Sequence, residues 1–443
     1  MRALTASVMV LGLFVGGYLL FGANLLAPNT EPREVQQNVF KQALVLNNPE
    51  IDSAFIHLVF PSGEAQNPYA EGLAHYVEHL AWLSAMKGPD QTRALKAHSN
   101  AWTNLYATGY WQQANPDTIT QTVGSLARIA APISLADTFA KQERDIVARE
   151  YDVRVTERPL QGVAREVSDL LFAGMPRGRS VIGRPDTIPD FDLAQAHLLH
   201  AQTHLLAQAT LFAFGNIDAA KLQTAIAAID APSQTTAPLP VVAIIGDDMA
   251  PLHDTADVAS PTAVQDTLIW RTLTPMPACG TALRCGLILE IAQDILDSTL
   301  PEGLAGALRF DNFVASQFWV TLRLAGRAHV EFDFVANPDS GVALDDLQAA
   351  FETTFRKTAL NGVSDASFDR IHSRLMSDID AVIDVSNYNK NSVLSALQTG
   401  DPITTLSEER RTLKTITRQD VNALLHNLST PYRHVVRRVT PER

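Results

Sequence analysis

The chain has 443 residues, of which 46% are hydrophobic and 19% are charged. This length exceeds one ordinary domain and suits two domains of about 200 residues each, and the hydrophobic content is that of a globular protein with a packed core. Phosphate binding requires a basic face that a formal net charge of −13 does not supply, so we expect no nucleic-acid partner.

The N-terminus carries a membrane signal. Residues 6–27 are almost wholly apolar and follow Arg2, and a run of this length can span a bilayer. A cleaved signal peptide needs small residues just before its cleavage site, and the sites near Ala23 and Ala27 are poor. We therefore expect residues 1–30 to be an uncleaved membrane anchor rather than a signal sequence, with the rest of the chain outside the cytoplasm because the positive charge precedes the span.

Two predicted strands follow a short polar linker. Residues 44–46 and 54–60 run or alternate in apolar side chains, as the strands of a half-buried sheet do. His57 lies within the second strand. Because no second histidine or carboxylate stands beside it at ligand spacing, we expect His57 on a face of the sheet and not at a metal.

The next predicted helix carries a metal-binding pattern in the run GLAHYVEHL, residues 72–80. On a helix of about 3.6 residues per turn, His75, Glu78 and His79 fall within an arc of roughly 100°, so their side chains face one way. Two imidazoles at i and i+4 can converge on one zinc ion, and Glu78 can take a proton from a metal-activated water. This H-x-x-E-H spacing is a signature of metal-assisted peptide hydrolysis. The alternative is a solvated surface helix.

Two further stretches bear on this pattern. Residues 100–113 are rich in β-branched and aromatic side chains and predict two short strands. Residues 136–155 predict a long helix in which Glu143 and Glu150, nearly two turns apart, share one stripe. Such a stripe either supplies the third protein ligand of a catalytic zinc site or is a solvated acidic face paired with neighbouring arginines.

Together these three stretches resemble the inverted-motif zinc peptidases, the insulinase, pitrilysin and mitochondrial processing peptidase family M16. The resemblance implies one zinc ion per chain and a role for five side chains: His75, His79 and Glu150 as zinc ligands, Glu78 as the catalytic base, and Glu143 as a supporting carboxylate. It also implies that Asn100 and Ala101 lie on an edge strand and contact a substrate peptide that pairs as an added strand. Arg149 stands where many relatives have a further glutamate, which leaves the ligand unchanged.

The resemblance further implies an α+β protein of two homologous α/β sandwich domains, with the LuxS/mitochondrial-processing-peptidase-like metallohydrolase fold. We expect a zinc-binding peptidase domain at residues 31–230 and a second, metal-free domain at 258–443. Between them, residues 231–257 predict a linker, because three prolines lie among small polar residues near its start. The second half repeats the order of the first, with strands expected at 267–273, 318–324, 330–335 and 434–439 and a helix at 283–298.

Histidines and cysteines outside the motif give weaker signals. His197, His200 and His204 lie at spacings of three and four on one predicted helix, but no carboxylate or cysteine joins them, so we expect a solvated helix face and no second metal. Cys279 and Cys285 are the two cysteines of the chain, and they fit either a small-loop disulfide in an oxidising compartment or two buried thiols.

The second domain departs from the family at residues 308–316. Relatives that cleave unaided place an arginine and a tyrosine around a Gly-Leu-Ala-Tyr-like stretch to grip the substrate. Here Arg309 keeps the arginine, whereas Phe313 and Ser316 replace the glycine and the tyrosine. Loss of one such hydrogen-bond donor costs about 2.7–4 kcal/mol of transition-state stabilisation. We expect full activity to need a homodimer or heterodimer with a same-fold subunit that supplies the Arg–Tyr pair, unless Tyr388 or Tyr432 takes over the role.

These observations predict a zinc endopeptidase that hydrolyses peptides or unfolded protein segments. We expect it in a bacterial inner membrane as a single-pass protein with its catalytic domains in the periplasm, or released to the periplasm if the segment is cleaved. One alternative is a catalytically silent partner subunit of the same fold, against which the intact set of site residues argues. A second alternative is a zinc-binding receptor domain without proteolytic activity.

Overall fold

The computed structural model describes residues 30–86, 98–231, 234–246 and 249–442. Residues 1–29 of the expected anchor lie outside this range. In the described part of the chain, no helix is long and apolar enough to cross a membrane.

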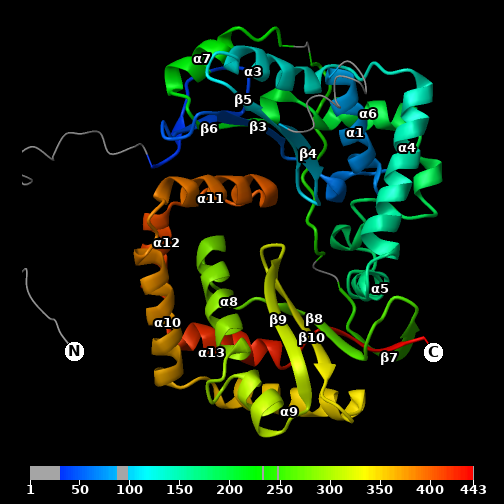
Figure 1. The fold of residues 1–443 in the computed structure, drawn as a ribbon, viewed down its shortest axis with the longest axis vertical. Coiled ribbons are helices and arrows are strands. Elements are labelled where there is room, and N and C mark those ends of the chain that lie inside the picture. The colour runs from blue at the N-terminus through cyan, green and yellow to red at the C-terminus, as the bar shows by residue number, and fades with distance from the viewer. Residues whose placement is uncertain (1–29, 87–97, 232–233, 247–248, 443) are drawn as a thin grey trace, which may run out of the picture.

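The first domain is a six-stranded sheet with helices on one face (Figure 1). Its strands follow the order β1-β2-β6-β3-β5-β4 across the sheet. Their bounds are β1 Arg33–Glu34, β2 Gln42–Asn47, β3 Ala54–Phe60, β4 Ser99–Thr103, β5 Thr108–Ala114 and β6 Thr210–Gly215. The helices are α1 Leu73–Ala85, α3 Ile119–Ala127, α4 Asp137–Tyr151, α5 Gln161–Leu171, α6 Leu193–Thr203 and α7 Ala219–Ala227.

The alternation of β3 explains the layers of this domain. Ile56, Leu58 and Phe60 are fully buried beneath α1, α3 and α7. The intervening His57 lies on the opposite face, where its ring is 6.0 Å from that of Phe212 and 6.1 Å from that of Trp111. The expected sheet-face position of His57 is confirmed.

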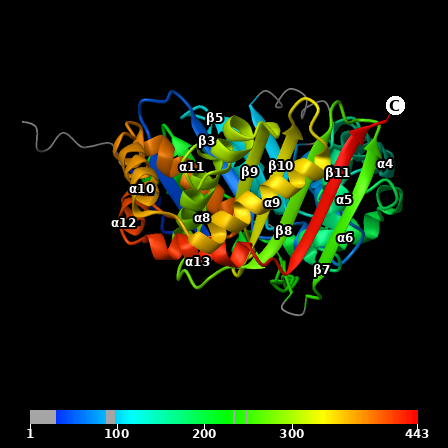
Figure 2. The same cartoon turned by 90° about the horizontal axis from the view of Figure 1, so that it is seen from below.

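The second domain is a five-stranded sheet in the order β7-β11-β8-β10-β9. Its strands are β7 Leu252–Ser260, β8 Thr267–Pro275, β9 Ala315–Ala325, β10 His329–Pro338 and β11 Arg433–Pro441. The helices are α8 Ala282–Asp297, α9 Leu344–Asn361, α10 Asp365–Asp380, α11 Val385–Thr399, α12 Leu406–Leu413 and α13 Arg418–Leu428. Figure 2 shows α9 crossing the strands, and buried side chains of α8, α9, α10 and α13 form the core of this domain with the sheet.

The two sheets share one topology. In each, the first strand of the repeat pairs in parallel with the last (β2 with β6, β7 with β11), and the other pairings are antiparallel. The order β2-β6-β3-β5-β4 therefore matches β7-β11-β8-β10-β9, and α1 corresponds to α8. The predicted pair of homologous α+β domains is confirmed.

One helix of each domain packs against the sheet of the other domain. Helix α11 covers the outer face of the first sheet, where Val393 packs against Leu44, Leu46, Phe212 and Phe214 (Figure 1). Helix α5 covers the outer face of the second sheet. There Val163, Val167 and Leu171 pack against side chains of β8 and β11, namely Ile269, Leu273, Val435 and Val439. The interface between the domains is therefore built like a hydrophobic core.

The segment between the domains is shorter than predicted. Strand β7 begins at Leu252, inside the expected linker of 231–257, and pairs along its whole length with β11. The start of the linker is also bound to the first domain, because the Gln234 side chain accepts a hydrogen bond from the Leu206 amide at 2.8 Å and donates one to the His204 carbonyl at 2.7 Å.

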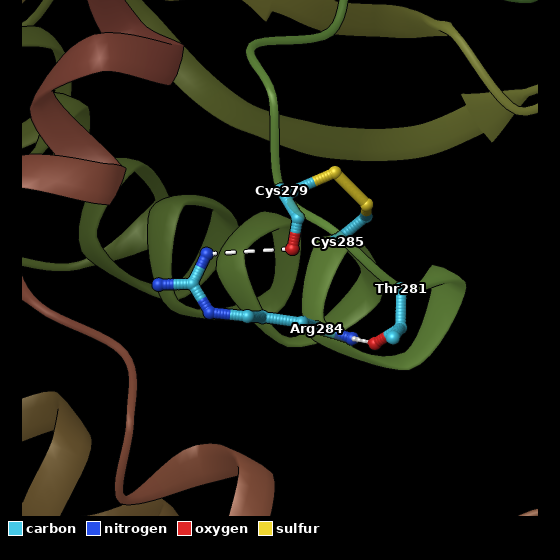
Figure 3. The surroundings of a disulfide bond; sticks show 4 residues. All are labelled: Cys279, Thr281, Arg284 and Cys285. Atoms are coloured by element: carbon cyan, nitrogen blue, oxygen red, sulfur yellow. Dashed lines mark hydrogen bonds between the residues drawn. A yellow bond between two sulfur atoms is a disulfide. The ribbon is translucent and has the colours of Figure 1, made fainter.

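Cys279 and Cys285 form a disulfide at the start of α8, with their Cα atoms 5.3 Å apart (Figure 3). The loop that the bond closes contains Thr281, whose hydroxyl accepts a hydrogen bond from the Arg284 amide and caps the helix. Of the two alternatives for these cysteines, the structure has the disulfide.

Candidate metal centre

The start of the motif helix α1 is held by the segment between α5 and α6. Gly72 has a φ of 91°, and a Cβ at this position would lie 2.3 Å from the Cα of Gly183, so the two backbones approach too closely for a side chain. The fully buried Glu64 carboxylate accepts hydrogen bonds from Arg179 at 2.8 Å and from Asn67 at 3.0 Å. These contacts fix where the helix begins and hence where its side chains point.

His75, Glu78 and His79 converge on one side of α1. Each offers a ligand atom, and these atoms lie within 4.8 Å of one another. The two imidazole rings stand almost at right angles, with their centroids 4.7 Å apart. Leu73 and Tyr76 on the same helix are buried among α4 and α6, so the packing of α1 positions the cluster. The convergence that helical spacing predicted is present.

Helix α4 adds the two predicted carboxylates. Glu150 Oε2 lies 3.5 Å from His75 Nε2 and 3.9 Å from His79 Nε2. Glu143 Oε2 lies 2.9 Å from His79 Nδ1, within hydrogen-bond distance. Because an ionised carboxylate only accepts, this contact places the proton of a neutral His79 on Nδ1 and leaves Nε2 facing Glu150 with a free lone pair.

Burial sets the protonation of the cluster. Burial, with a smaller contribution from His79, lowers the pKa of His75 well below its ordinary value and keeps that imidazole neutral. Burial alone would also lower the pKa of His79, but the hydrogen bond to Glu143 and the charge of Glu78 raise it overall. Burial raises the pKa of Glu78 to about 7, against the opposing effects of His79 and of a hydrogen bond from Thr103.

The donor set fits a zinc ion. Glu150 Oε2 is buried, accepts no hydrogen bond within the described residues, and faces the Nε2 atoms of His75 and His79. A buried carboxylate oxygen without a donor is costly, and a cation would satisfy it. Two nitrogens and one carboxylate oxygen form a common protein ligand set of catalytic zinc sites, which leave a further position open.

The edge strand β4 lies beside the cluster. It is the last strand of its sheet and pairs only with β5 in the described structure, and Asn100 and Ala101 are on it. Thr103, which alternation places on the same side of the strand as Ala101, donates a hydrogen bond to Glu78 Oε2 at 2.7 Å. We did not single out Thr103 from the sequence, although the two-residue period could have indicated it once Ala101 was placed near the site.

Arg309 is not brought to the cluster. It lies in the turn of residues 306–311 that packs against α9 and β9, and its guanidinium carbon stands 5.5 Å from the centre of the Phe310 ring. No hydrogen bond or ion pair joins it to the cluster among the residues that the structure describes. Tyr432, an alternative donor, directs its hydroxyl to the Met249 carbonyl in the second domain.

The second histidine group is structural. His200 and His204 are buried with their rings 4.5 Å apart, so the expected solvated face is wrong for both, and only His197 is exposed. His204 is hydrogen-bonded to the Tyr110 hydroxyl at 2.8 Å, and His200 donates to the Ile129 carbonyl at 2.8 Å. Partners of this kind satisfy the buried imidazoles without a metal, because each ring bonds to neighbouring protein groups.

The fold and this cluster together are those of the inverted-motif metallopeptidase class. The sequence model of the family described as Insulinase (Peptidase family M16) matches residues 42–184, which contain the whole cluster. An uncharacterized zinc protease of Rickettsia bellii is 27% identical over 161 residues, which make up 34% of this chain and 37% of that protein. The chain therefore matches peptidase family M16, the insulinase family, over residues 42–184.

Solved structures share the fold across both domains. A protease from Helicobacter pylori matches with a TM-score of 0.74 at 18% sequence identity, over 93% of this chain and 99% of that one. The periplasmic protease PqqL from Escherichia coli matches with a TM-score of 0.76 at 14% identity, over 94% of this chain and 48% of that one. The likeness therefore extends to the second domain, beyond the region that the family's sequence model covers.

Proposed function

We propose that this protein is a zinc-dependent endopeptidase that hydrolyses peptides or unfolded protein segments. The observation that carries the proposal is the approach of Glu150 Oε2 to both His75 Nε2 and His79 Nε2 beside a buried Glu78. In this proposal His75, His79 and Glu150 hold the ion. Zinc, when bound, acts as a Lewis acid that brings the pKa of a water molecule to about 7.

The chain's own groups would handle the proton and the substrate. Thr103 occupies Glu78 Oε2, which leaves Oε1 to take a proton and later return it to the leaving amine. A substrate peptide would pair as an added strand on β4 at Asn100 and Ala101, where main-chain hydrogen bonds give affinity without strict side-chain selection. Glu143 would keep the Nδ1 proton on His79 and so hold its ring in position.

Glu78→Gln tests this proposal in the full-length protein. The parent should contain close to one zinc per chain by metal analysis and lose cleavage of an unstructured peptide on chelation. The variant should keep its zinc but lose cleavage, because a carboxamide cannot take the proton. A variant that still cleaves would refute the role of Glu78, and a parent that binds zinc without cleaving any peptide would favour the receptor alternative.

A second candidate is a subunit that needs a same-fold partner for full activity. The observation that favours it is local: Phe313 has a φ of 50°, a conformation that suits the glycine of relatives, and Ser316 donates its hydroxyl to the Asn337 carbonyl at 3.3 Å. No phenol is therefore available at this position. The native mass of the isolated protein and its cleavage of a peptide test whether a partner is needed. A monomer with an ordinary turnover rate would exclude the partner. Activity that rises when a same-fold subunit is added would support it.

We also propose a periplasmic location, with residues 1–30 as the membrane anchor. The disulfide between Cys279 and Cys285 suits an oxidising compartment, and PqqL, which shares the fold, is described as a periplasmic protease. Cell fractionation with and without residues 1–30 tests both parts.

A further inference from the structure

Arg154 stands next to the candidate metal centre, on an unusual turn. Helix α4 ends at Tyr151 and continues as a π-helical turn, Asp152–Thr156, in which no residue is buried. Isolated π-helical turns occur often at functional sites. The turn brings Arg154 Nη2 to 3.6 Å from Glu150 Oε1, while the Arg154 side chain remains 58% exposed.

The guanidinium of Arg154 has N–H groups that are available to bind a ligand. Its distance to Glu150 is too long for a hydrogen bond, and none of its five N–H groups donates one within the described residues. By contrast, Arg144 on the same helix is engaged, since it donates to the Pro189 carbonyl at 3.1 Å.

An ordinary helical ion pair does not account for this arrangement. Glutamate followed by arginine at i+4 stabilises a surface helix only weakly, and such a pair needs no particular neighbour. Here the glutamate's other oxygen faces two imidazoles, so the pair is part of the site's rim. A planar guanidinium with free donors at the rim of a desolvated site is suited to bidentate binding of a carboxylate.

We propose that Arg154 binds a carboxylate of the substrate close to the scissile bond, so that the site selects acidic peptides. This inference rests on the proposed peptidase function and names its substrate class. The carboxylate belongs either to an aspartate or glutamate side chain or to the C-terminus of a short peptide.

The test uses unstructured peptides that differ only in charge. One series exchanges aspartate and glutamate for asparagine and glutamine around the cleavage site, and a second series caps the C-terminus as an amide. Cleavage is measured with the full-length parent, and binding with the Glu78→Gln protein by fluorescence anisotropy. We expect the parent to cleave and Glu78→Gln to bind the acidic peptides about 10- to 100-fold better than the neutral ones, as loss of hydrogen bonds to a charged group implies.

Arg154→Gln should abolish this preference in both measurements, and Arg154→Lys should restore part of it as a point charge. Arg149→Gln is the matched control, because Arg149 is an exposed arginine of the same helix on a different face from Glu150. The control should keep the preference. Sensitivity to the amide cap alone would identify the C-terminal carboxylate, and sensitivity to the side-chain series would identify an internal acid.

Two results would overturn the inference: no acidic preference in the parent, or an unchanged preference in Arg154→Gln. If that variant also loses zinc, Arg154 would be assigned to supporting Glu150. If no peptide is cleaved at all, the peptidase proposal fails, yet the comparison of acidic and neutral peptides binding to the Glu78→Gln protein still decides the role of Arg154.

Discussion

Glu150 adds a third ligand to the two histidines, because its Oε2 lies 3.5 Å from His75 Nε2 and 3.9 Å from His79 Nε2. We expect Glu150→Gln to lose most of its zinc, since a neutral carboxamide is a weaker ligand for a dication than a carboxylate. Zinc content after dialysis against a mild chelator measures this. Glu157→Gln, an exposed change on the following turn, is the control. A Glu150→Gln protein that binds zinc as tightly as the parent would remove Glu150 from the ligand set.

Glu143 acts through His79 and not on the metal directly. Its 2.9 Å contact with Nδ1 orients the ring, and loss of such a supporting carboxylate typically weakens metal affinity or activity by about 10–100-fold. We expect Glu143→Gln to show a loss of this size in competition with a chelator, while the variant still binds one zinc at saturation. An unchanged zinc affinity would mean that Glu143 is part of a solvated acidic face, the alternative that the sequence also allowed.

For single residues, the sequence predicts which side chains lie together when they belong to the same helix. The spacing of His75, Glu78 and His79 was sufficient to place them together. The approach of Glu150 depends on how α4 packs against α1, which periodicity within either helix does not contain, so its role came from the family resemblance. Thr103 and Arg154 were missed because their places depend on strand pairing and on a π-helical turn.

Among the elements, α1 depends on the glycine at its start. A side chain at Gly72 would be strained by the φ of 91° and would collide with the Gly183 backbone. We expect Gly72→Ala to destabilise the protein by at least about 1–3 kcal/mol, the cost of a residue held in a poorly allowed conformation. Thermal or urea unfolding measures the change.

In the matched control, Gly124→Ala, we expect the stability to change in the opposite direction. Gly124 lies inside α3, and a Cβ there meets no atom within 4 Å. Gly124→Ala should stabilise by about 0.5–1 kcal/mol, because alanine loses less backbone entropy in a helix. Equal effects of the two substitutions would show that the turn before α1 does not need its glycine.

Strand β7 shows why one element escaped prediction. Its sequence LHDTADVAS places one aspartate on each face of the strand, Asp254 on the half-buried face and Asp257 on the exposed one, and has little of the β-branched content that marks strands. Its partners come from the far end of the chain, since Asp254 pairs with Arg437 at 2.6 Å and Asp257 with Arg438 at 2.7 Å. Cross-strand pairs of this kind stabilise a sheet but are invisible to a local pattern. The other strands of the second domain were predicted because their apolar alternation is local.

For the whole molecule, a buried charge cluster ties the two domains together. Arg177 of the first domain lies 2.8 Å from Glu331 of β10, which also contacts Arg323 at 3.1 Å and is 1% exposed. Burial alone would raise the pKa of Glu331, but Arg177, Arg323 and Arg271 lower it overall. The ionised carboxylate therefore stabilises the folded state above its ordinary pKa of 4.5, and this stabilisation is lost as the pH falls through the lowered value.

We expect Glu331→Gln to cost about 3–5 kcal/mol at neutral pH, as removal of one partner from a buried ion pair does. The difference from the parent should shrink as the pH falls below 4.5, where the unfolded parent binds a proton at Glu331, and should vanish once the pH is below the lowered pKa of the folded state. Urea unfolding of both proteins across this range measures it. A difference that stays constant with pH would mean that the charge of Glu331 does not stabilise the fold.

The exchange of α5 and α11 between the domains has a consequence for biogenesis. During synthesis the first domain is complete in its strands by Gly215, yet the apolar outer face of its sheet stays uncovered until α11, ending at Thr399, has been made. A nascent chain would thus need a chaperone or translocon to shield Leu46 and Phe214. We expect the halves made separately, divided between Pro240 and the exposed Val241, to aggregate alone and to assemble into a soluble pair when co-expressed. A first half that is soluble and monomeric alone would show that its sheet can mature before the second half exists.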